Sequence, residues 1–417
     1  MCFVYLTIRI FFVKLIHNDT KQYQRNDTMD IQKFHNMFSN KYFCNMKKMG
    51  YKYPNDMADF ISTLKEFYYK PLPIYDFDGK NLVYIDSKAN INMDSYKLLM
   101  MNQSKAYGEK AVEEEIISTA KIESIDYSRD SVRNILKGYA PKDDAENRIF
   151  GMKKGFDFIA DKKNKITEEN IYKLYMMAVG DFLDDENKLL AGNKYRHDSV
   201  HIQDLAGEVA HTGINHNDLP NSMANLVDFI NENDGMNELV KAAIIHFYIA
   251  YLHPYFDGNG RMARLVHLWY LVQQGFDNTL FIPFSSYIVK SVKKYYEAYT
   301  LIEVNQKLTS IIDVTPFIIY FAENVYGKFE KQEISVDVFD LFKQALAKGE
   351  VTAKEEQLWQ FVVANYGTSA FSTKQLEKDY GNAAYATIRA FVLKFENLGL
   401  LSSQSYGNRV KYKTKRK

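Results

Sequence analysis

Two strongly apolar segments joined by one short polar loop constrain the fold more than any other feature of the chain. Residues 237–252 (NELVKAAIIHFYIAYL) carry apolar side chains at helical spacing nearly all round, which is typical of a buried helix. The loop HPYFDGNGRMAR follows, and the segment LVHLWYLVQQGF then forms a second apolar helix that ends at Gly275. This order of helix, tight polar loop and helix predicts a mainly α-helical domain in the middle of the chain.

Further helices are expected around this pair. Helical patterns also cover residues 106–138, 167–183, 285–304 and 314–328. A β-hairpin is predicted where Asp78-Gly79-Lys80 joins PIYDF to NLVYI, because Asp-Gly is a strong turn signal between apolar runs. A second, short hairpin is predicted around Val200 and Ile202, where β-branched and polar residues alternate.

Composition narrows the class of protein. With 417 residues, 46% hydrophobic and 25% charged, the chain has the make-up of a globular protein with two or three domains. Its 53 basic and 52 acidic side chains leave a net charge of +1, so no overall field attracts it to nucleic acid or to acidic lipid. Two cysteines, Cys2 and Cys44, cannot form a disulfide framework, and we expect a reducing, cytoplasmic setting.

The first sixteen residues are mostly apolar but are a poor match to a signal peptide or a membrane anchor. Arg9 and Lys14 interrupt the stretch, which is shorter than the roughly 20 residues that span a bilayer. A polar segment without a small-residue cleavage site follows. A signal peptide or anchor stays as the alternative, but we favour residues 1–28 as an upstream extension before Met29, and we expect no membrane partner.

The C-terminal region changes pattern after about Phe329. Thr352 with Glu355 and Ser372 with Gln375 form two capping boxes, each ahead of a short helix. A third helix begins near Asn382, and the last residues alternate like a strand pair. Residues 335–417 therefore resemble a winged helix-turn-helix domain. The third helix carries Arg389 and Lys394, and the strand pair and tail after it carry Arg409, Lys411, Lys413, Lys415, Arg416 and Lys417. DNA is one candidate partner, and docking of a protein or a second copy is the alternative, because the third helix offers few base-reading side chains.

The loop after residue 252 has the chemistry of an anion site. Gly258 and Gly260 flank Asn259 and let the backbone approach a ligand closely. Because the loop opens directly into a helix, unsatisfied N–H groups and the positive end of the helix dipole meet at one point. Arg261 lies in the first turn, and Arg264 lies one turn further on nearly the same face. These features predict a site for more than one phosphate group.

Two further residues of the loop point to a reaction rather than to binding alone. Asp257 supplies a hard oxygen ligand suited to Mg²⁺ that bridges phosphates. His253 ends the preceding helix, and an imidazole with a pKa near 6.5 is suited to remove a proton at neutral pH. The combination predicts phosphoryl or nucleotidyl transfer.

Residues 253–264 resemble the signature of the Fic family, His-x-Phe-x-Asp/Glu-Gly-Asn-Gly-Arg-x-x-Arg. Every position matches except the Phe, which is Tyr255 here. The resemblance implies a helical enzyme that transfers AMP from ATP to a Ser, Thr or Tyr hydroxyl of a target protein or of itself. Related Doc-type kinases carry Lys at the position of Gly260, so kinase activity is disfavoured.

The resemblance also assigns roles to these residues. His253 would deprotonate the target hydroxyl, and Asp257 would hold Mg²⁺. The phosphates would lie against Asn259, the backbone of Gly258 and Gly260, and the side chain of Arg261, with Arg264 at the γ-phosphate.

A second segment, Thr119 to Glu123, resembles the inhibitory helix motif of the family, although Ser124 follows where Gly or Asn is usual. The Glu123 carboxylate would then pair with Arg264 and take the place of the γ-phosphate. The alternative is that Glu123 is one of several solvated acids of a helix that begins with Glu113, Glu114 and Glu115.

Two weaker likenesses complete the site. Val200, His201 and Ile202, after the Ala191-Gly192-x-x-Tyr195-Arg196 approach, resemble the flap that would hold the target segment extended. Tyr295 and Tyr296 resemble the aromatic pair near the adenine pocket, although Glu303 stands where Asn is often found. Two helical tyrosines are equally well explained as core residues.

Together these features predict a mainly α fold with a Fic-type core over residues 105–328, a short β-hairpin flap and a C-terminal winged helix. Residues 29–104 form an N-terminal region of unclear fold. Two further hypotheses stay open, namely a DNA-binding regulator with a nucleotide-sensing domain and an enzyme that removes AMP with the help of Glu123. The preferred nucleotide and a homodimeric state are open as well.

Overall fold

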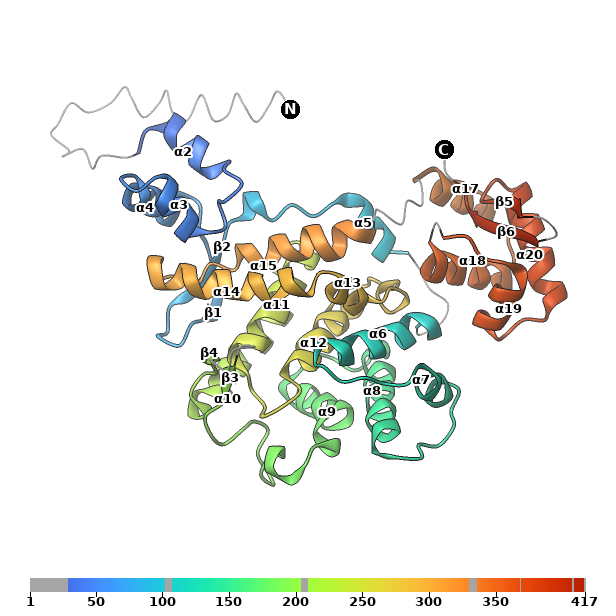
Figure 1. Ribbon diagram of the computed structural model, residues 1–417, viewed down its shortest axis with the longest axis horizontal. Coiled ribbons are helices and arrows are strands. Elements are labelled where there is room, and N and C mark those ends of the chain that lie inside the picture. Colours follow the sequence, from blue (N-terminus) through green and yellow to red (C-terminus); the bar gives the residue numbers. More distant parts are fainter. Residues whose placement is uncertain are drawn as a thin grey trace. The chain divides into compact units, whose positions relative to one another are not determined.

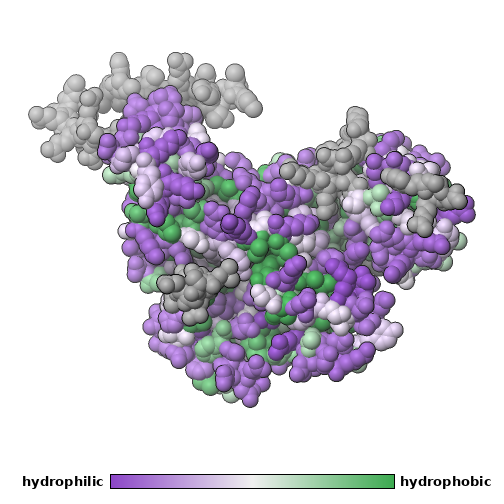
Figure 2. All heavy atoms as spheres, viewed as in Figure 1, coloured by the Kyte–Doolittle hydropathy of each residue, from purple (hydrophilic) through white to green (hydrophobic). Residues whose placement is uncertain are grey.

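The computed structural model describes residues 29–101, 107–203, 209–329, 336–367, 369–406 and 409–415. The predicted extension over residues 1–28 and the tail residues Arg416 and Lys417 lie outside this part of the chain. The fold is mainly helical, and its strands pair as three separate antiparallel hairpins in the described segments (Figure 1). Hydrophilic residues cover most of the face seen in Figure 2. No helix in the described ranges is both long and apolar enough to cross a membrane.

The chain divides into two compact units, residues 1–43 with 48–68 and residues 44–47 with 69–417. In the first unit, helices α2 (Ile31–Phe38) and α4 (Met57–Phe67) enclose a small aromatic core. The Phe34 ring lies 5.3 Å from the Phe60 ring and 4.8 Å from the Tyr68 ring. The short helix α3 (Met46–Lys52) has residues in both units.

The second unit is built around one buried helix pair. Helices α11 (Glu238–Leu252) and α12 (Asn259–Gln273) pack against each other and are buried on nearly every face, as the sequence predicted. Figure 1 shows them between α14 and α15 on one side and α8 and α9 on the other. The surrounding helices are α5 (Met93–Leu99), α6 (Glu109–Ile122), α7 (Arg129–Leu136), α8 (Asp144–Ala160), α9 (Glu168–Ala178), α10 (Leu219–Asn231), α13 (Phe284–Lys290), α14 (Val292–Thr309), α15 (Thr315–Tyr320) and α16 (Gly327–Phe329), the last preceded by a π-helical turn, Phe321–Tyr326.

Both predicted hairpins are present. Strands β1 (Lys70–Tyr75) and β2 (Asn81–Tyr84) are joined by the turn that contains Gly79, whose φ of 77° explains the need for glycine. Strands β3 (His201–Gln203) and β4 (Val209–Thr212) form the second, shorter hairpin.

Two predicted helices are broken in the structure. The run over residues 106–138 separates into α6 and α7, because Ser124 adopts the left-handed conformation with φ of 59°. The run over residues 285–304 is interrupted at Ser291, which has φ of −130° and separates α13 from α14. Neither break involves Gly or Pro, so helical periodicity alone did not reveal it.

The C-terminal residues form the predicted series of helices followed by a hairpin, with one additional helix, α17 (Val336–Ala347), in front. Helix α18 (Ala353–Tyr366) begins with the predicted capping box of Thr352 and Glu355. Helices α19 (Thr373–Tyr380) and α20 (Tyr385–Asn397) precede strands β5 (Leu401–Tyr406) and β6 (Arg409–Thr414). The apolar core of this region includes Trp359 and Phe395. The assignment of a winged helix stays a prediction.

The loop between α11 and α12 rests on a buried pair of aromatic rings. Tyr255 is fully buried and stacks on Tyr175 of α9, with ring centroids 3.6 Å apart and planes only 3° from parallel. Its hydroxyl has no hydrogen-bond partner among the described residues. The ring therefore contributes packing, while its oxygen is a buried polar group without compensation.

We expect Tyr255→Phe to raise the free energy of unfolding by on the order of 1 kcal/mol, because it removes an uncompensated hydroxyl and keeps the stacked ring. Tyr326→Phe is the matched control, since the buried Tyr326 hydroxyl donates to the Leu239 carbonyl at 2.9 Å. That change should lower stability. Urea unfolding of both variants measures the difference, and a clear loss of stability in Tyr255→Phe would show that its hydroxyl has a partner.

Candidate active site

The loop between α11 and α12 is shaped by two left-handed residues. His253 ends α11 with φ of 53° and ψ of 62°, a conformation that costs energy for any residue with a side chain. Gly258 precedes α12 with φ of 81°, and a Cβ there would lie 2.5 Å from a methyl carbon of Val179. Glycine is required at this position for its conformation and for its lack of a side chain.

Asn259 holds the loop in shape. Its side-chain oxygen accepts from the Tyr255 amide at 2.9 Å, and its side-chain nitrogen donates to the Tyr255 carbonyl at 2.8 Å. The side chain is buried, and both ends of its amide are engaged. In the structure Asn259 positions the backbone at Tyr255, and its predicted contact with phosphate stays a prediction.

Arg264 is the central cation of the site. Its guanidinium is almost fully buried and donates to the Thr119 hydroxyl at 2.6 Å and to the Glu123 carboxylate at 2.6 Å. Its third nitrogen, Nη1, has no partner within the described residues, and neither has the Nε of buried Arg261. Buried donors without acceptors are costly, so these two nitrogen atoms are suited to an incoming anion.

Glu123 occupies the anion position at the start of α12. Its carboxylate is ion-paired with Arg264, so it is not one of the solvated acids of α6. A Cβ added to Gly260 would lie 2.3 Å from the Glu123 Oε1 atom and 3.2 Å from the Arg264 Nη1 atom. The carboxylate thus lies directly against the first turn of a helix, where the dipole and the free N–H groups favour negative charge.

Asp257 and Arg261 face each other at the entrance of the loop. The Arg261 Nη2 atom lies 2.9 Å from an Asp257 oxygen, and the Asp257 side chain is about half exposed, at 46%. Within the described ranges there is no cluster of three or more His, Cys, Asp or Glu residues that could hold a metal on its own. One accessible carboxylate beside a phosphate site is nevertheless the arrangement by which proteins bind Mg²⁺ together with a substrate.

His253 is held as a neutral base. Its Nδ1 atom lies 3.4 Å from the Ala250 carbonyl, which can only accept, so Nδ1 carries the proton and Nε2 keeps a lone pair. Burial lowers the pKa of His253 to about 4. The imidazole is therefore uncharged at neutral pH and able to accept a proton.

Arg196 is a site residue that sequence reasoning named only as part of the approach to the flap. It is 2% exposed, and its Nε atom donates to the His253 carbonyl at 2.8 Å. Its other nitrogens donate to the carbonyls of Asp198, at 2.6 Å, and Ile214. One buried guanidinium thus ties the loop between α11 and α12 to both ends of the β3–β4 hairpin, and only the tertiary structure reveals this role.

The predicted flap lies beside the loop. His201 pairs with Thr212 and Ile202 with His211 across the β3–β4 hairpin, and Val200 accepts from Gly213 at 3.1 Å. A Cβ on Gly213 would lie 3.1 Å from the Cβ of His253, so the base of the hairpin touches the catalytic loop.

His211 anchors this hairpin from the other side. Its two ring nitrogens each lie 2.8 Å from an acceptor, the Glu303 carboxylate of α14 and the Tyr251 carbonyl of α11. Glu303, which departs from the family pattern, is thus committed to holding the flap.

The two predicted adenine-pocket tyrosines have different environments. Tyr295 is buried in the core, 2.9 Å from the Nε2 atom of His246. Tyr296 is half exposed, and its hydroxyl donates to the Ile122 carbonyl at the end of α6, at 3.3 Å. Tyr296 is the more accessible of the two rings, and the buried Tyr295 matches the alternative of a core residue. A place beside an adenine stays a prediction for both.

Known proteins resemble the segment that contains this site. Residues 165–271 match the model of the Fic/DOC family. Protein adenylyltransferase fic-1 of Caenorhabditis briggsae is 27% identical over 111 residues, which cover 26% of this chain and 19% of that protein. Protein adenylyltransferase Fic of Drosophila ananassae is 25% identical over 263 residues, or 60% of this chain and 47% of that protein. The chain thus spans less than half the length of these curated relatives.

Two solved structures align with this chain at lower identity. A Fic family protein from Desulfovibrio desulfuricans aligns with 18% identity and a TM-score of 0.43, covering 74% of this chain and 88% of that one. Fic-1 from C. elegans aligns with 20% identity and a TM-score of 0.43, covering 57% and 69% of the two chains. The signature loop of residues 253–264 lies inside the segment that matches the Fic/DOC family model.

Proposed function

We propose that the chain transfers AMP from ATP to a hydroxyl group of a protein, either a target or the chain itself, and that Glu123 restrains the transfer. The observation that carries this proposal is the buried Arg264–Glu123 pair at the start of α12. It combines an anion site, unpartnered arginine nitrogens and a carboxylate in the place of a phosphate. The names of the curated relatives support the same reaction class.

In the proposed reaction, the Nε2 atom of His253 accepts the proton of the target hydroxyl. The hydroxyl oxygen attacks the α-phosphorus of ATP, a new P–O bond forms, and the bond to the leaving pyrophosphate breaks. Nδ1 stays protonated against the Ala250 carbonyl, which keeps the lone pair of Nε2 directed away from the helix end. Asp257 would hold Mg²⁺, which when bound neutralises charge on the phosphates.

The phosphates would lie where the chain offers donors without acceptors. Arg261 and Arg264 each carry one nitrogen atom without a partner among the described residues, and both lie in the first two turns of α12, whose first backbone N–H groups lack intrahelical acceptors. Fixed donors of this kind stabilise the charge that develops in the transition state. The flap, anchored by Arg196 and His211, would present the target segment to His253.

Restraint follows from competition for one position. As long as the Glu123 carboxylate occupies the Arg264 guanidinium, the γ-phosphate cannot take the same place. A Glu123 side chain that is one quarter exposed could also orient a water molecule, which supports AMP removal as a second candidate.

DNA binding by residues 335–417 stays an alternative. Of its two predicted helix residues, Lys394 is already paired with Glu355 at 2.7 Å, while Arg389 is exposed.

We expect Glu123→Gln to raise the incorporation of α-labelled ATP into protein at least tenfold, because Arg264 becomes available to phosphate. His253→Ala in the same background should abolish labelling. Glu114→Gln is the matched control, since Glu114 lies on the same helix, pairs with Arg129 and has a side-chain exposure of 29% against 25% for Glu123. Labelling that is equal in wild type, Glu123→Gln and the His253→Ala double variant would reject the mechanism.

Two further assays separate the alternatives. Competition with unlabelled GTP, UTP and CTP identifies the preferred nucleotide. Loss of pre-attached AMP in wild type, but not in Glu123→Gln, would favour the removal reaction.

The pH profile tests the state of His253. Because burial lowers its pKa to about 4, the neutral base is fully present above pH 5. The rate of transfer by Glu123→Gln should therefore stay level between pH 5.5 and 8 and decline only as the pH approaches about 4. The same shift makes the folded state less stable as the pH falls below about 6.5, the unfolded value, since only the folded state resists protonation. A rate that rises with a midpoint near pH 6.5 would contradict a desolvated base.

Ser124 tests the geometry at the end of α6. We expect Ser124→Gly to stabilise the fold by about 1 kcal/mol, because glycine adopts the left-handed conformation without strain. Inhibition should be retained, since the Glu123 side chain stays in place. Ser128→Gly is the control, because Ser128 has an ordinary φ of −60° and should lose stability with glycine. Thermal unfolding measures both, and a destabilising Ser124→Gly would contradict the assigned conformation.

A further inference from the structure

We propose that a pocket between α13, α14 and α16 binds an anion that carries several phosphate groups. The pocket shares no lining residue with the loop at His253, and the proposal is independent of the reaction proposed above. Its volume of about 720 Å³ lies in the range of small-molecule sites. It is lined by Tyr287, Val289, Lys290, Ser291, Val292, Lys293, Lys294, Asn324 and Lys328.

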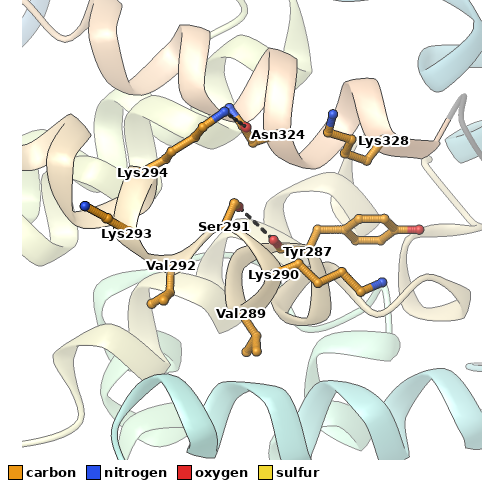
Figure 3. Close-up of a pocket in the computed structure, with 9 residues that line it drawn as sticks. All are labelled: Tyr287, Val289, Lys290, Ser291, Val292, Lys293, Lys294, Asn324 and Lys328. Carbon is orange, nitrogen blue, oxygen red and sulfur yellow. Dashed lines mark hydrogen bonds between the residues drawn. The ribbon is translucent and has the colours of Figure 1, made fainter.

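The lining is strongly positive and carries no compensating acid. Four of its nine residues are lysines and none is acidic. Figure 3 shows Lys293 and Lys294 on one side of Ser291, and Lys290 and Lys328 on the other. Gathering like charges in one hollow is unfavourable unless an anion neutralises them.

Most ion pairs among the described residues join a lysine to a carboxylate, but three lysines of this pocket form none. Within the described residues, Lys290, Lys293 and Lys294 have no carboxylate oxygen within 4 Å. Their side chains are exposed, so their ammonium groups are available to a ligand. Lys290 additionally lies over the Tyr287 ring, 5.1 Å from its centre.

The floor of the pocket is polar and well ordered by buried contacts. Asn324 is 7% exposed, and its side-chain oxygen accepts from the Lys294 ammonium at 3.1 Å, as Figure 3 shows. The Ser291 hydroxyl donates to the Tyr287 carbonyl at 2.8 Å and lies 2.9 Å from the Tyr320 hydroxyl. Asn324 thus holds one ammonium at the rim, and Ser291 fixes the junction between the two helices.

The start of α14 adds to the positive potential. This helix is 18 residues long and begins at Val292, inside the pocket, with no side chain capping its first turn. The Lys294 amide donates to the Ser291 carbonyl at 2.9 Å, and the positive end of the helix dipole lies at Val292, which is one of the lining residues. The helix dipole and the lysines therefore both favour a negatively charged ligand in this pocket.

Phosphate groups match this pocket better than a single carboxylate does. Lysines bind phosphate as flexible point charges, and several of them suit a ligand with several charges. A free polyphosphate and the backbone of a nucleic acid share this chemistry. The test therefore uses both as probes.

The experiment measures binding of inorganic tripolyphosphate by calorimetry and of a fluorescent single-stranded oligonucleotide by anisotropy, each to the full chain. The test variant is Lys290→Gln with Lys293→Gln and Lys294→Gln. The control variant, Lys162→Gln with Lys163→Gln and Lys165→Gln, removes the same charge from a different surface. Unchanged thermal unfolding shows that both variants are folded.

We expect the test variant to bind at least one probe ten times more weakly or worse, and the control variant to bind within twofold of wild type. If the test variant binds the oligonucleotide more weakly, the slope of log K against log salt concentration should also decrease in magnitude by about 2. This is the value expected for three fewer phosphate contacts on a single strand. Loss confined to tripolyphosphate identifies a free polyphosphate instead. Equal affinities in wild type and test variant for both probes, or an equal loss in the control, would overturn the proposal. Since no outcome depends on AMP transfer, the pocket can be refuted while the proposed reaction stands.

Discussion

The buried guanidinium of Arg264 is the constraint on which the rest of the site depends. A cation that is 96% shielded from water needs an anion and hydrogen-bond acceptors. Here Glu123 and Thr119 supply them to two of its three nitrogen atoms, and Nη1 has no partner among the described residues. Removing one partner of such a pair typically costs 3–5 kcal/mol unless another anion takes its place. A phosphate that bound at this position would therefore have to replace the Glu123 carboxylate, because the buried guanidinium is unfavourable without an anion.

The position of Glu123 is set by the whole of α6 rather than by its last turn. In the middle of the helix, the buried Glu115 carboxylate accepts from the Ser285 amide at 2.7 Å, and burial raises the pKa of Glu115 to about 7. On the adjoining face, Glu113 binds Arg133 of α7 at 3.0 Å. Because these contacts fix α6 at several points along its length, the carboxylate at its end is delivered to Arg264 without a large loss of chain entropy.

The sequence predicted those features of the site that depend on residues close together in the chain. The spacing of His253, Asp257 and the arginines, the two long apolar helices and the capping box at Thr352 are local patterns, and each has its counterpart in the structure. The clamp made by Arg196 was not readable, because its acceptors are carbonyls up to 57 residues away, which any sequence provides. The break at Ser124 was missed because serine does not itself prefer the left-handed conformation that ends α6 there, with the Ile125 amide bonded back to the Ala120 carbonyl at 2.9 Å.

The positive charge at Arg264 and the positive charges around Lys293 differ in burial and in mobility. At Arg264 the charge is buried, rigid and bonded on nearly every side, so the shape of the anion and the direction of its oxygens decide what binds. Around Lys293 the charges are exposed and mobile on long stems, so the number of charges on the ligand decides more than its shape. Added salt screens exposed charges far more than buried ones, and an ionic-strength series should therefore weaken the lysine pocket while it leaves the Arg264–Glu123 pair nearly intact.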